Sequence, residues 1–554
     1  MTGDEAPVGG IHLGMRFGHP ADAAPSARRA LDIAFRLIVI GDFGGPGDGV
    51  PVEAGGPDIA ELMQRLGAAV AFDVQNHLSD APPALRVTLP LASLRDLDPV
   101  GLSARIPEIA AALAQAPAVA AAPADRPNED AHALGGPGPA RDAGDDDDAF
   151  DRLLDLVDLP DSAPAATAGS ALSAFIAAGS KPAATPSATV ASAPHVEEQL
   201  RAVASHPRWL AVEAAWRSLR PILAAWGSRP STRVFVCDLA DDADLADVLG
   251  AEAFAAALPS GDGLGAVVHL GAFGPSPHDL DRLDRVAAAA DRYGLPAIVT
   301  LSADFFGRPP AVVAAMDNPA ALLEAPALAA WRGLAARPEA GFLFPTWNDV
   351  VLRPAAGPAP VLWGGAGAVL ASRVLASLAV SGFPTEILGT ETALRGLDLV
   401  ETTGPDHRPV ALPVRAAVGV DVARLLGSEG IGCLVARPDR DRAWFLRAPT
   451  AAAVGSEADP PALAAFADLP FRFVSTLIEA RLQAAVAAVD GAAEAQAAAA
   501  IAAALSDLVD ASGAGGGVAV VPAGDADGER RFEVTVTLGT AVMGGFAFSL
   551  ELSA

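Results

Sequence analysis

The sequence predicts a multidomain α/β (α+β) protein with a small N-terminal α/β unit, a disordered acidic linker and a larger two-part α/β region. The first observation is length, because 554 residues are enough for several domains of ordinary size. The second is that short β-rich runs alternate with helical patterns on both sides of the linker. The third is the linker itself, residues 117–194, whose Ala, Pro, Gly and Asp content offers little apolar area to bury.

The N-terminal part divides into a flexible leader, residues 1–30, and a compact α/β unit, residues 31–116. The leader is rich in Gly, Ala and Pro and has no sustained hydrophobic period. The β-rich run 35–40 predicts a buried strand, residues 58–66 predict a short helix, and the alternating run 85–91 predicts a second strand.

One stretch of the linker has helical periodicity. Residues 150–159 directly follow an aspartate run at 145–148. Their apolar side chains fall on one helical face: Phe150, Leu153, Leu154 and Val157. An amphipathic segment with such flanks indicates either a docking helix for a partner or a helix that packs on its own domain, because short helices need a partner to persist.

The larger region, residues 195–454, alternates strands and helices, which predicts an α/β sheet. One helix has a stripe of large residues at spacings of three and four that we expect to be core: Trp209, Val212, Trp216, Leu219, Leu223 and Trp226. A second helix is expected over residues 280–293. The expected strands are 233–239, 265–270 and 297–301, followed by a pair at 431–435 and 443–446.

The sequence of the C-terminal region, residues 455–554, predicts a long helical stretch over 471–508 and two strands, 532–538 and 546–552. In the first of these strands four apolar residues alternate with polar ones: Phe532, Val534, Val536 and Leu538. A terminal hairpin can complete its own sheet or add to the sheet edge of another subunit, and the pattern is compatible with both arrangements.

Charge and composition exclude several classes of function. The chain has 38 Lys and Arg against 67 Asp and Glu, a formal net charge of -29, so its field repels nucleic acid. The single lysine, Lys181, lies in Gly-Ser-Lys-Pro, which excludes a phosphate-binding P-loop. Two cysteines, Cys237 and Cys433, fit a reducing compartment such as the cytoplasm. We expect neither a signal peptide nor a membrane span.

No arrangement of catalytic residues is visible in the sequence. The HExxH, GxSxG and metal-spaced Cys/His patterns are absent. Residues 45–49 are glycine-rich and follow a strand but lack the GxGxxG order, so we expect a plain turn that Asp42 caps. His195 and Glu197 lack the PCxxC partner of a zinc deaminase and indicate a polar helix start. We therefore expect a non-enzyme without a cofactor or a metal.

Short motifs on both sides of the linker share their residue order with one known family. Residues 36–45, which end in Gly-Asp-Phe-Gly-Gly, and residues 94–99 resemble its small subunit. Residues 206–219, His-Pro-Arg-Trp-Leu-Ala-Val-Glu-Ala-Ala-Trp-Arg-Ser-Leu, resemble its large subunit, as do 331–340 and 430–445 in part. The motif core consists of Trp209, Glu213, Trp216, Arg217 and Leu219. The family is the contractile sheath of bacterial type VI secretion systems, here with its small (TssB/VipA-type) and large (TssC/VipB-type) subunits joined in one chain.

The resemblance implies a structural protomer of a cytoplasmic sheath that polymerises around an inner tube and contracts to propel it. It implies no cofactor and no membrane insertion. The implied partners are other protomers, the inner-tube protein, the baseplate and an AAA+ disassembly ATPase that grips the helix at 150–159. Strand exchange between protomers would use the strand at 532–538. The chain departs from the family at residues 344–354, where a Pro-Arg-rich stretch is replaced, and 554 residues are few for both subunits together.

Two alternatives belong to other classes. A baseplate or accessory secretion component could share these domains without polymerising. A soluble α/β ligand-binding protein or enzyme would instead use the glycine-rich loop at 44–49, and it predicts a small oligomer with a deep polar pocket.

Overall fold

The structure is a computed structural model. It describes residues 12–14, 33–115, 194–227, 229–239, 248, 250–261, 263–403, 408–452, 467–489, 493–526, 529–539, 542–543 and 545–553. The predicted docking helix, with Phe150, Leu153, Leu154 and Val157, lies outside these residues, as does most of the predicted linker.

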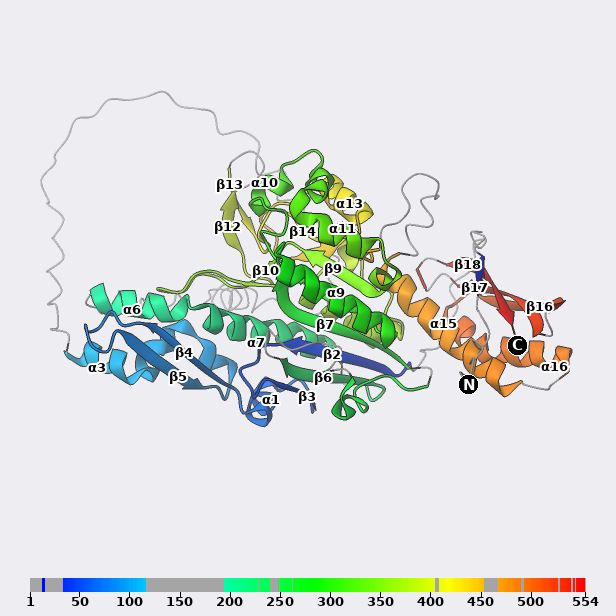
Figure 1. Cartoon of the computed structure of the whole chain (residues 1–554), viewed down its shortest axis with the longest axis horizontal. Coiled ribbons are helices and arrows are strands. Elements are labelled where there is room, and N and C mark those ends of the chain that lie inside the picture. The colour runs from blue at the N-terminus through cyan, green and yellow to red at the C-terminus, as the bar shows by residue number, and fades with distance from the viewer. Residues whose placement is uncertain are drawn as a thin grey trace, which may run out of the picture. The chain divides into compact units, whose positions relative to one another are not determined.

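An eight-stranded sheet forms the centre of the protein (Figure 1). Its strands, in spatial order, are β15 (Ala443–Phe445), β14 (Gly432–Ala436), β9 (Leu343–Trp347), β8 (Ala297–Leu301), β7 (Leu264–Phe273), β2 (Phe35–Gly41), β6 (Thr232–Leu239) and β3 (Asp48–Glu53). The six inner strands run parallel, and the two edge strands, β15 and β3, run antiparallel to their neighbours. The predicted α/β class is therefore confirmed.

The first strand of this sheet in sequence order, β2, lies in its interior. Its residue Val39 is in register with Val236 of β6 on one side and with Val268 of β7 on the other. All three side chains are buried. The described parts of Met1–Ala111 and His195–Ala554 accordingly form one compact unit. The N-terminal and larger sequence regions thus share a sheet and a core.

Helices cover both faces of the sheet. On one face Ile38 and Ile40 belong to a buried cluster that includes Leu283 of α9 (Pro277–Arg292). On the other face α12 (Ala366–Ser381) approaches so closely that a Cβ on Gly367 would lie 3.1 Å from the Thr300 hydroxyl. Helix α7 (Pro207–Ala225) packs beside α12. Three stacked layers therefore position the loops at the ends of the parallel strands.

A smaller layer precedes the large region in sequence and packs against it. It consists of α1 (Ile59–Leu66), the antiparallel pair β4 (Ala69–Gln75) and β5 (Ala84–Pro90), η1 (Leu94–Leu97), η2 (Pro99–Gly101), α2 (Leu102–Arg105) and α3 (Pro107–Gln115). The side chain of Gln199, on α6 (Pro194–Ala204), accepts a hydrogen bond of 2.6 Å from the amide of His77. The rings of Phe72 and His206 stack with centroids 4.1 Å apart.

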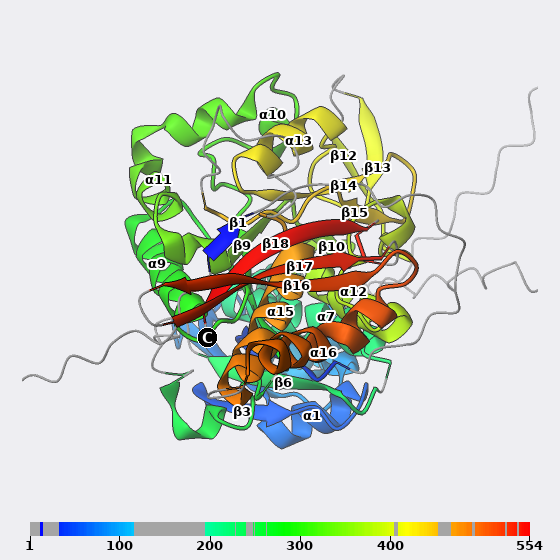
Figure 2. The ribbon, with the colours of Figure 1, turned by 90° about the vertical axis from the view of Figure 1, so that its right-hand side faces the viewer.

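A second, four-stranded sheet lies at the C-terminal end of the sequence (Figure 2). Its order is β1 (His12–Gly14), β18 (Phe546–Ser553), β17 (Glu529–Leu538) and β16 (Gly517–Ala526). The two strands expected from the sequence are β17 and β18, and they pair antiparallel. The apolar residues of β17 are fully buried: Phe532, Val534, Val536 and Leu538.

The helical stretch expected over 471–508 consists of two helices in the structure. These are α15 (Leu469–Ala488) and α16 (Glu494–Ala511). The sequence between them includes Asp490 and Gly491, residue types that favour turns over helix. Phe473 of α15 contacts Phe35 of the central sheet edge to face, with centroids 5.7 Å apart.

The remaining elements are short connections. They are η3 (Glu252–Phe254), α10 (Pro310–Ala314), η4 (Pro319–Glu324), η5 (Pro326–Leu328), α11 (Ala329–Ala335), η6 (Pro338–Phe342), β10 (Val350–Arg353), β11 (Leu362–Gly364), η7 (Thr390–Thr392), β12 (Val400–Thr403), β13 (Pro409–Leu412) and α13 (Val420–Ser428). Among the described helices, none combines the length and the hydropathy that a bilayer span requires.

The burial of both cysteines gives a test of the central sheet. Burial, with the charges of Asp238 and Asp48, raises the pKa of the Cys237 thiol to about 12, and burial also raises the pKa of Cys433. We expect iodoacetamide at about pH 8 to leave both thiols unmodified in the native protein, because the thiolate is the reactive form. Mass spectrometry should show two adducts only after unfolding in guanidinium. Rapid native labelling of Cys237 would contradict its position in β6.

Candidate functional site

Helix α7 carries the motif that resembles the large sheath subunit. It begins after His206, whose Nδ1 accepts a hydrogen bond of 3.2 Å from the amide of Arg208, and Pro207 occupies the first turn. The motif residues Trp209, Glu213, Trp216 and Leu219 are fully buried, whereas Arg217 is partly exposed. The motif therefore lies at the inner face of the helix, where it can join other parts of the fold.

Glu213 is a buried carboxylate held by two arginines. Arg353, at the end of β10, donates from Nε to Oε1 at 2.7 Å and from Nη2 to Oε2 at 3.1 Å. Arg217 donates from Nε to Oε1 at 2.8 Å. Arg353 also donates to the carbonyl oxygens of Pro354 and Pro360. This network fixes α7 to β10 and to the loop that follows it.

Trp216 joins the two sheath-like motifs directly. Its indole Nε1 donates a hydrogen bond of 2.9 Å to the carbonyl oxygen of Phe43, in the turn that resembles the small subunit. The two aromatic rings meet edge to face, with centroids 5.0 Å apart. Both side chains are fully buried. The small-subunit turn is thereby fixed to the large-subunit helix.

The glycine-rich turn after β2 is closed by Asp238, at the end of β6. The carboxylate of Asp238 accepts hydrogen bonds from the amides of Phe43, at 2.6 Å, and Gly47, at 2.7 Å. Asp42 accepts from the amide of Gly44 at 3.1 Å, so the predicted capping role of Asp42 is confirmed. Because a protein carboxylate already occupies these amides, the turn is not arranged to receive a phosphate.

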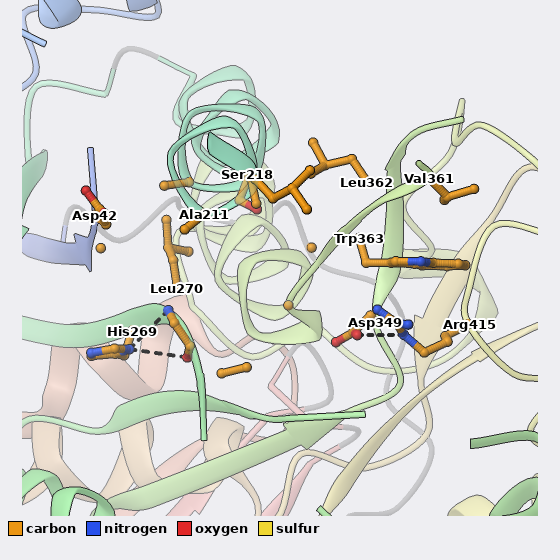
Figure 3. A pocket seen from close by; sticks show the side chains of 18 of the residues that line it. Asp42, Ala211, Ser218, His269, Leu270, Asp349, Val361, Leu362, Trp363 and Arg415 are labelled. Atoms are coloured by element: carbon orange, nitrogen blue, oxygen red, sulfur yellow. Dashed lines mark hydrogen bonds and ion pairs between the residues drawn. The ribbon is translucent and has the colours of Figure 1, made fainter. Parts of the chain in front are cut away.

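A cavity of about 360 Å³ lies beside this turn, at the carboxyl ends of the parallel strands (Figure 3). Ligands in open α/β sheets bind where the strand order reverses, and here β6 and β7 lie on opposite sides of β2. The polar residues that line the cavity are Asp42, Ser218, His269, Asp349 and Arg415, together with Trp363. The cavity is the candidate site for a small molecule in this fold.

The charged groups of the cavity are engaged with one another, with the backbone or with Arg208 outside it. Arg415 Nε donates to Asp349 Oδ2 at 2.8 Å, and its guanidinium lies 4.4 Å from the centroid of the Trp363 ring. Burial raises the pKa of Asp349, and Arg415 opposes that rise. The amide of Gly271 donates to His269 Nδ1 at 3.1 Å, and Asp42 forms an ion pair with Arg208. Figure 3 shows the Asp349–Arg415 pair on one side of the cavity and His269 on another.

The contacts of the cavity residues connect its walls to one another. A nucleophilic mechanism needs a nucleophile within hydrogen-bond reach of a base that a third group orients. The contacts of His269 and Asp349 instead hold the walls of the cavity. Within the described part of the chain, no three His, Cys, Asp or Glu side chains are grouped as metal ligands.

Sequence reasoning located only part of this region. Asp42 and the motif on α7 were recognised, but Asp238, Arg353, Asp349 and Arg415 were not. A signal existed for Asp238, since an aspartate that ends a buried strand often binds a neighbouring loop. No sequence signal existed for Arg353 and Arg415, because their partners, Glu213 and Asp349, lie 140 and 66 residues away in sequence.

Two family models match the chain. Residues 193–360 match VipB, a family described as the EvpB tail sheath N-terminal domain. Residues 23–121 match the type VI secretion system VipA family. A comparison with curated proteins gives no match. The matched regions include the motifs at 36–45, 94–99 and 206–219, so the resemblance to the small and large sheath subunits is confirmed.

The Glu213 network predicts a strong effect on stability. Replacing Glu213→Gln leaves Arg353 buried without its full countercharge, and we expect a loss of about 3–5 kcal/mol in the free energy of unfolding. Chemical denaturation would measure it. The control is Glu197→Gln on α6, which breaks an exposed pair with Arg201 of 2.8 Å and should cost about 0.5 kcal/mol at most. Equal effects of the two substitutions would contradict the assigned role of Glu213.

His206 predicts a pH dependence of stability. Burial lowers the pKa of its imidazole below the usual 6.5. At pH values below 6.5 the imidazole of the unfolded chain binds a proton more readily than that of the folded chain. The free energy of unfolding should therefore fall as pH decreases from 6.5 towards the lowered pKa. His206→Asn keeps a capping side chain without a titrating group. Urea midpoints at about pH 7.5 and about pH 5.5 should differ less in His206→Asn than in the wild type; an equal shift would exclude His206 as a source.

Proposed function

Since this chain is a component of the type VI secretion sheath, with a small-subunit and a large-subunit region in one polypeptide, we propose that it is a structural protomer that polymerises around an inner tube and contracts to propel it. The observation that carries the proposal is the position of β2 between β6 and β7. Fusion fixes the two subunits at equal number, and the shared sheet makes them one mechanical body.

Contraction in this proposal is a rearrangement between rigid protomers. The body that would move is held by buried contacts that cross the two regions: β2 in the sheet, Trp216 on Phe43, and Asp238 on the turn. Closely packed cores do not deform continuously, so a lattice of such bodies switches by rigid-body motion at its interfaces. A small preference of each protomer for the contracted packing sums over the polymer.

Assembly would use the C-terminal sheet. Strand β17, with Phe532, Val534, Val536 and Leu538, lies between β16 and β18. Both of its edges are therefore paired with strands of the same chain. Strand β1 pairs with β18 over three residue pairs only, at the edge of the sheet. Exchange of such a short edge strand between chains keeps the same hydrogen bonds and links protomers in an open series.

The remaining partners are proposed from the resemblance to the sheath family. The inner-tube protein, the baseplate and other protomers are the proposed contacts of the sheath, and the cytoplasm is its proposed location. The segment with Phe150, Leu153, Leu154 and Val157 is the proposed grip for an AAA+ ATPase. The proposed role requires no catalytic residue and no cofactor.

The primary experiment is expression of the chain, alone and with the inner-tube protein, followed by negative-stain electron microscopy and sedimentation. Hollow tubes of uniform width support the proposal. Small particles in both conditions would exclude polymerisation by this chain and favour an accessory component.

Truncation tests the role of the C-terminal sheet. A chain that ends before Phe532 lacks most of β17 and all of β18, and a chain that begins at residue 33 lacks β1. We expect both to remain soluble protomers that form no tubes in sedimentation and microscopy. Glu533→Gln, at an exposed position of β17, is the control and should assemble normally. Tubes of normal width from either truncated chain would contradict strand exchange through this sheet.

A further inference from the structure

Four arginines line one cleft of the protein. The cleft takes no part in the proposed strand exchange or in the pairing of the central sheet. The cleft has a volume of about 430 Å³ and lies along α7 and α12, which are side by side (Figure 2). Arg217 and Arg220 come from α7, Arg373 from α12, and Arg395 from the loop after η7. Asp398 is the one carboxylate among the residues that line it.

These arginines are short of countercharge. Arg217 shares the Glu213 carboxylate with Arg353. Arg373 Nε donates to the Ser372 hydroxyl at 3.3 Å, and burial lowers the pKa of its guanidinium. Among the described residues, no carboxylate lies in salt-bridge range of Arg220, Arg373 or Arg395.

Like charges that converge in this way repel one another. Arg217 and Arg220 are three residues apart on one helix, which places them on neighbouring turns of the same face. Arg373 is partly buried without a countercharge, which is costly, and an external anion would remove that cost, whereas Arg220 and Arg395 are exposed. The cleft is thus poised to receive negative charge.

The lining also contains apolar surface, which narrows the kind of partner. The apolar residues are Pro221, Ala224, Val351, Val369, Leu394 and Leu397. An apolar floor beside arginines is the composition of a protein interface, where arginine is enriched and a dry centre adds affinity. A protein surface with carboxylates at its rim fits these features better than a free inorganic anion.

We propose that this cleft docks an acidic surface of a second copy of the chain. The inference rests on the proposed polymer. Each copy has a formal net charge of -29, so neighbouring copies repel unless positive groups lie where they touch. The contact is heterologous: the cleft of one copy meets a different, acidic face of the next, as an open helical lattice requires.

Photo-crosslinking identifies the occupant directly. A photoreactive amino acid in place of the exposed Ala224 leaves all four arginines intact. Isotopically light and heavy chains are mixed, assembled with the inner-tube protein, irradiated and analysed by mass spectrometry. The expected product joins a light chain to a heavy one, at a peptide rich in Asp or Glu. Cross-links confined to one chain, or made to the inner-tube protein, overturn the proposal.

Charge reversal gives the functional readout. Arg220→Glu with Arg395→Glu changes two exposed side chains, and we expect the pelleted polymer to fall about tenfold at physiological salt. Arg440→Glu is the matched control, since Arg440 is exposed and lies outside the cleft. Thermal unfolding checks that each variant is folded. Wild-type levels of polymer from the folded double variant overturn the proposal.

The two proposals fail separately. A wild-type chain that forms no tubes under any condition refutes the sheath function. In that case the docking proposal is tested by photo-crosslinking of the chain in concentrated solution. Products that join a light chain to a heavy chain support docking of a second copy, and their absence refutes it. Tubes from the wild type and from the double variant alike refute only the docking.

Discussion

The fold depends on one constraint: β2 is hydrogen-bonded along both edges, to β6 and to β7. A strand with two filled edges and two covered faces cannot leave without opening the core. The turn that follows it inherits this rigidity, because Asp238 at the end of β6 binds its amides and Trp216 binds its carbonyl. The sheath-like motifs on either side of the linker meet at this point.

The cavity beside the turn and the arginine cleft differ in how their charges are balanced. The cavity at the ends of β2 and β7 has walls held by internal ion pairs and backbone contacts, and its arginine already has an aspartate. The cleft along α7 and α12 contains arginines whose charge is not balanced within the described structure. A site whose charges are paired can bind a neutral molecule, whereas a site with unpaired arginines favours an anionic partner. Of these two sites, the cleft is therefore the one that fits an acidic surface of a second copy.

Much of the secondary structure could be predicted from local pattern, since β2, β6, β8 and β17 are continuous or alternating apolar runs. The weaker strands could not: β3 contains Gly49 and Pro51, which resemble a loop, and small alanines dilute the alternation of β4. Pairing is not encoded in a period of two, so nothing local indicated that β2 joins β6 and β7. Glu213 was visible in its motif, but Arg353 becomes its partner only through the fold.

The interior place of β2 also has a consequence during synthesis. The strand leaves the ribosome early, yet its partner β7 is about 230 residues further along the chain. At bacterial and eukaryotic elongation rates this is a delay of about 10–50 s, and both edges of the strand stay open until β6, which precedes β7, has been made. Such a strand is prone to aggregation, and closing so long a loop is slow. The need of the nascent chain for chaperones therefore depends on how late the partners of β2 are translated. It does not depend on the stability of the folded protomer.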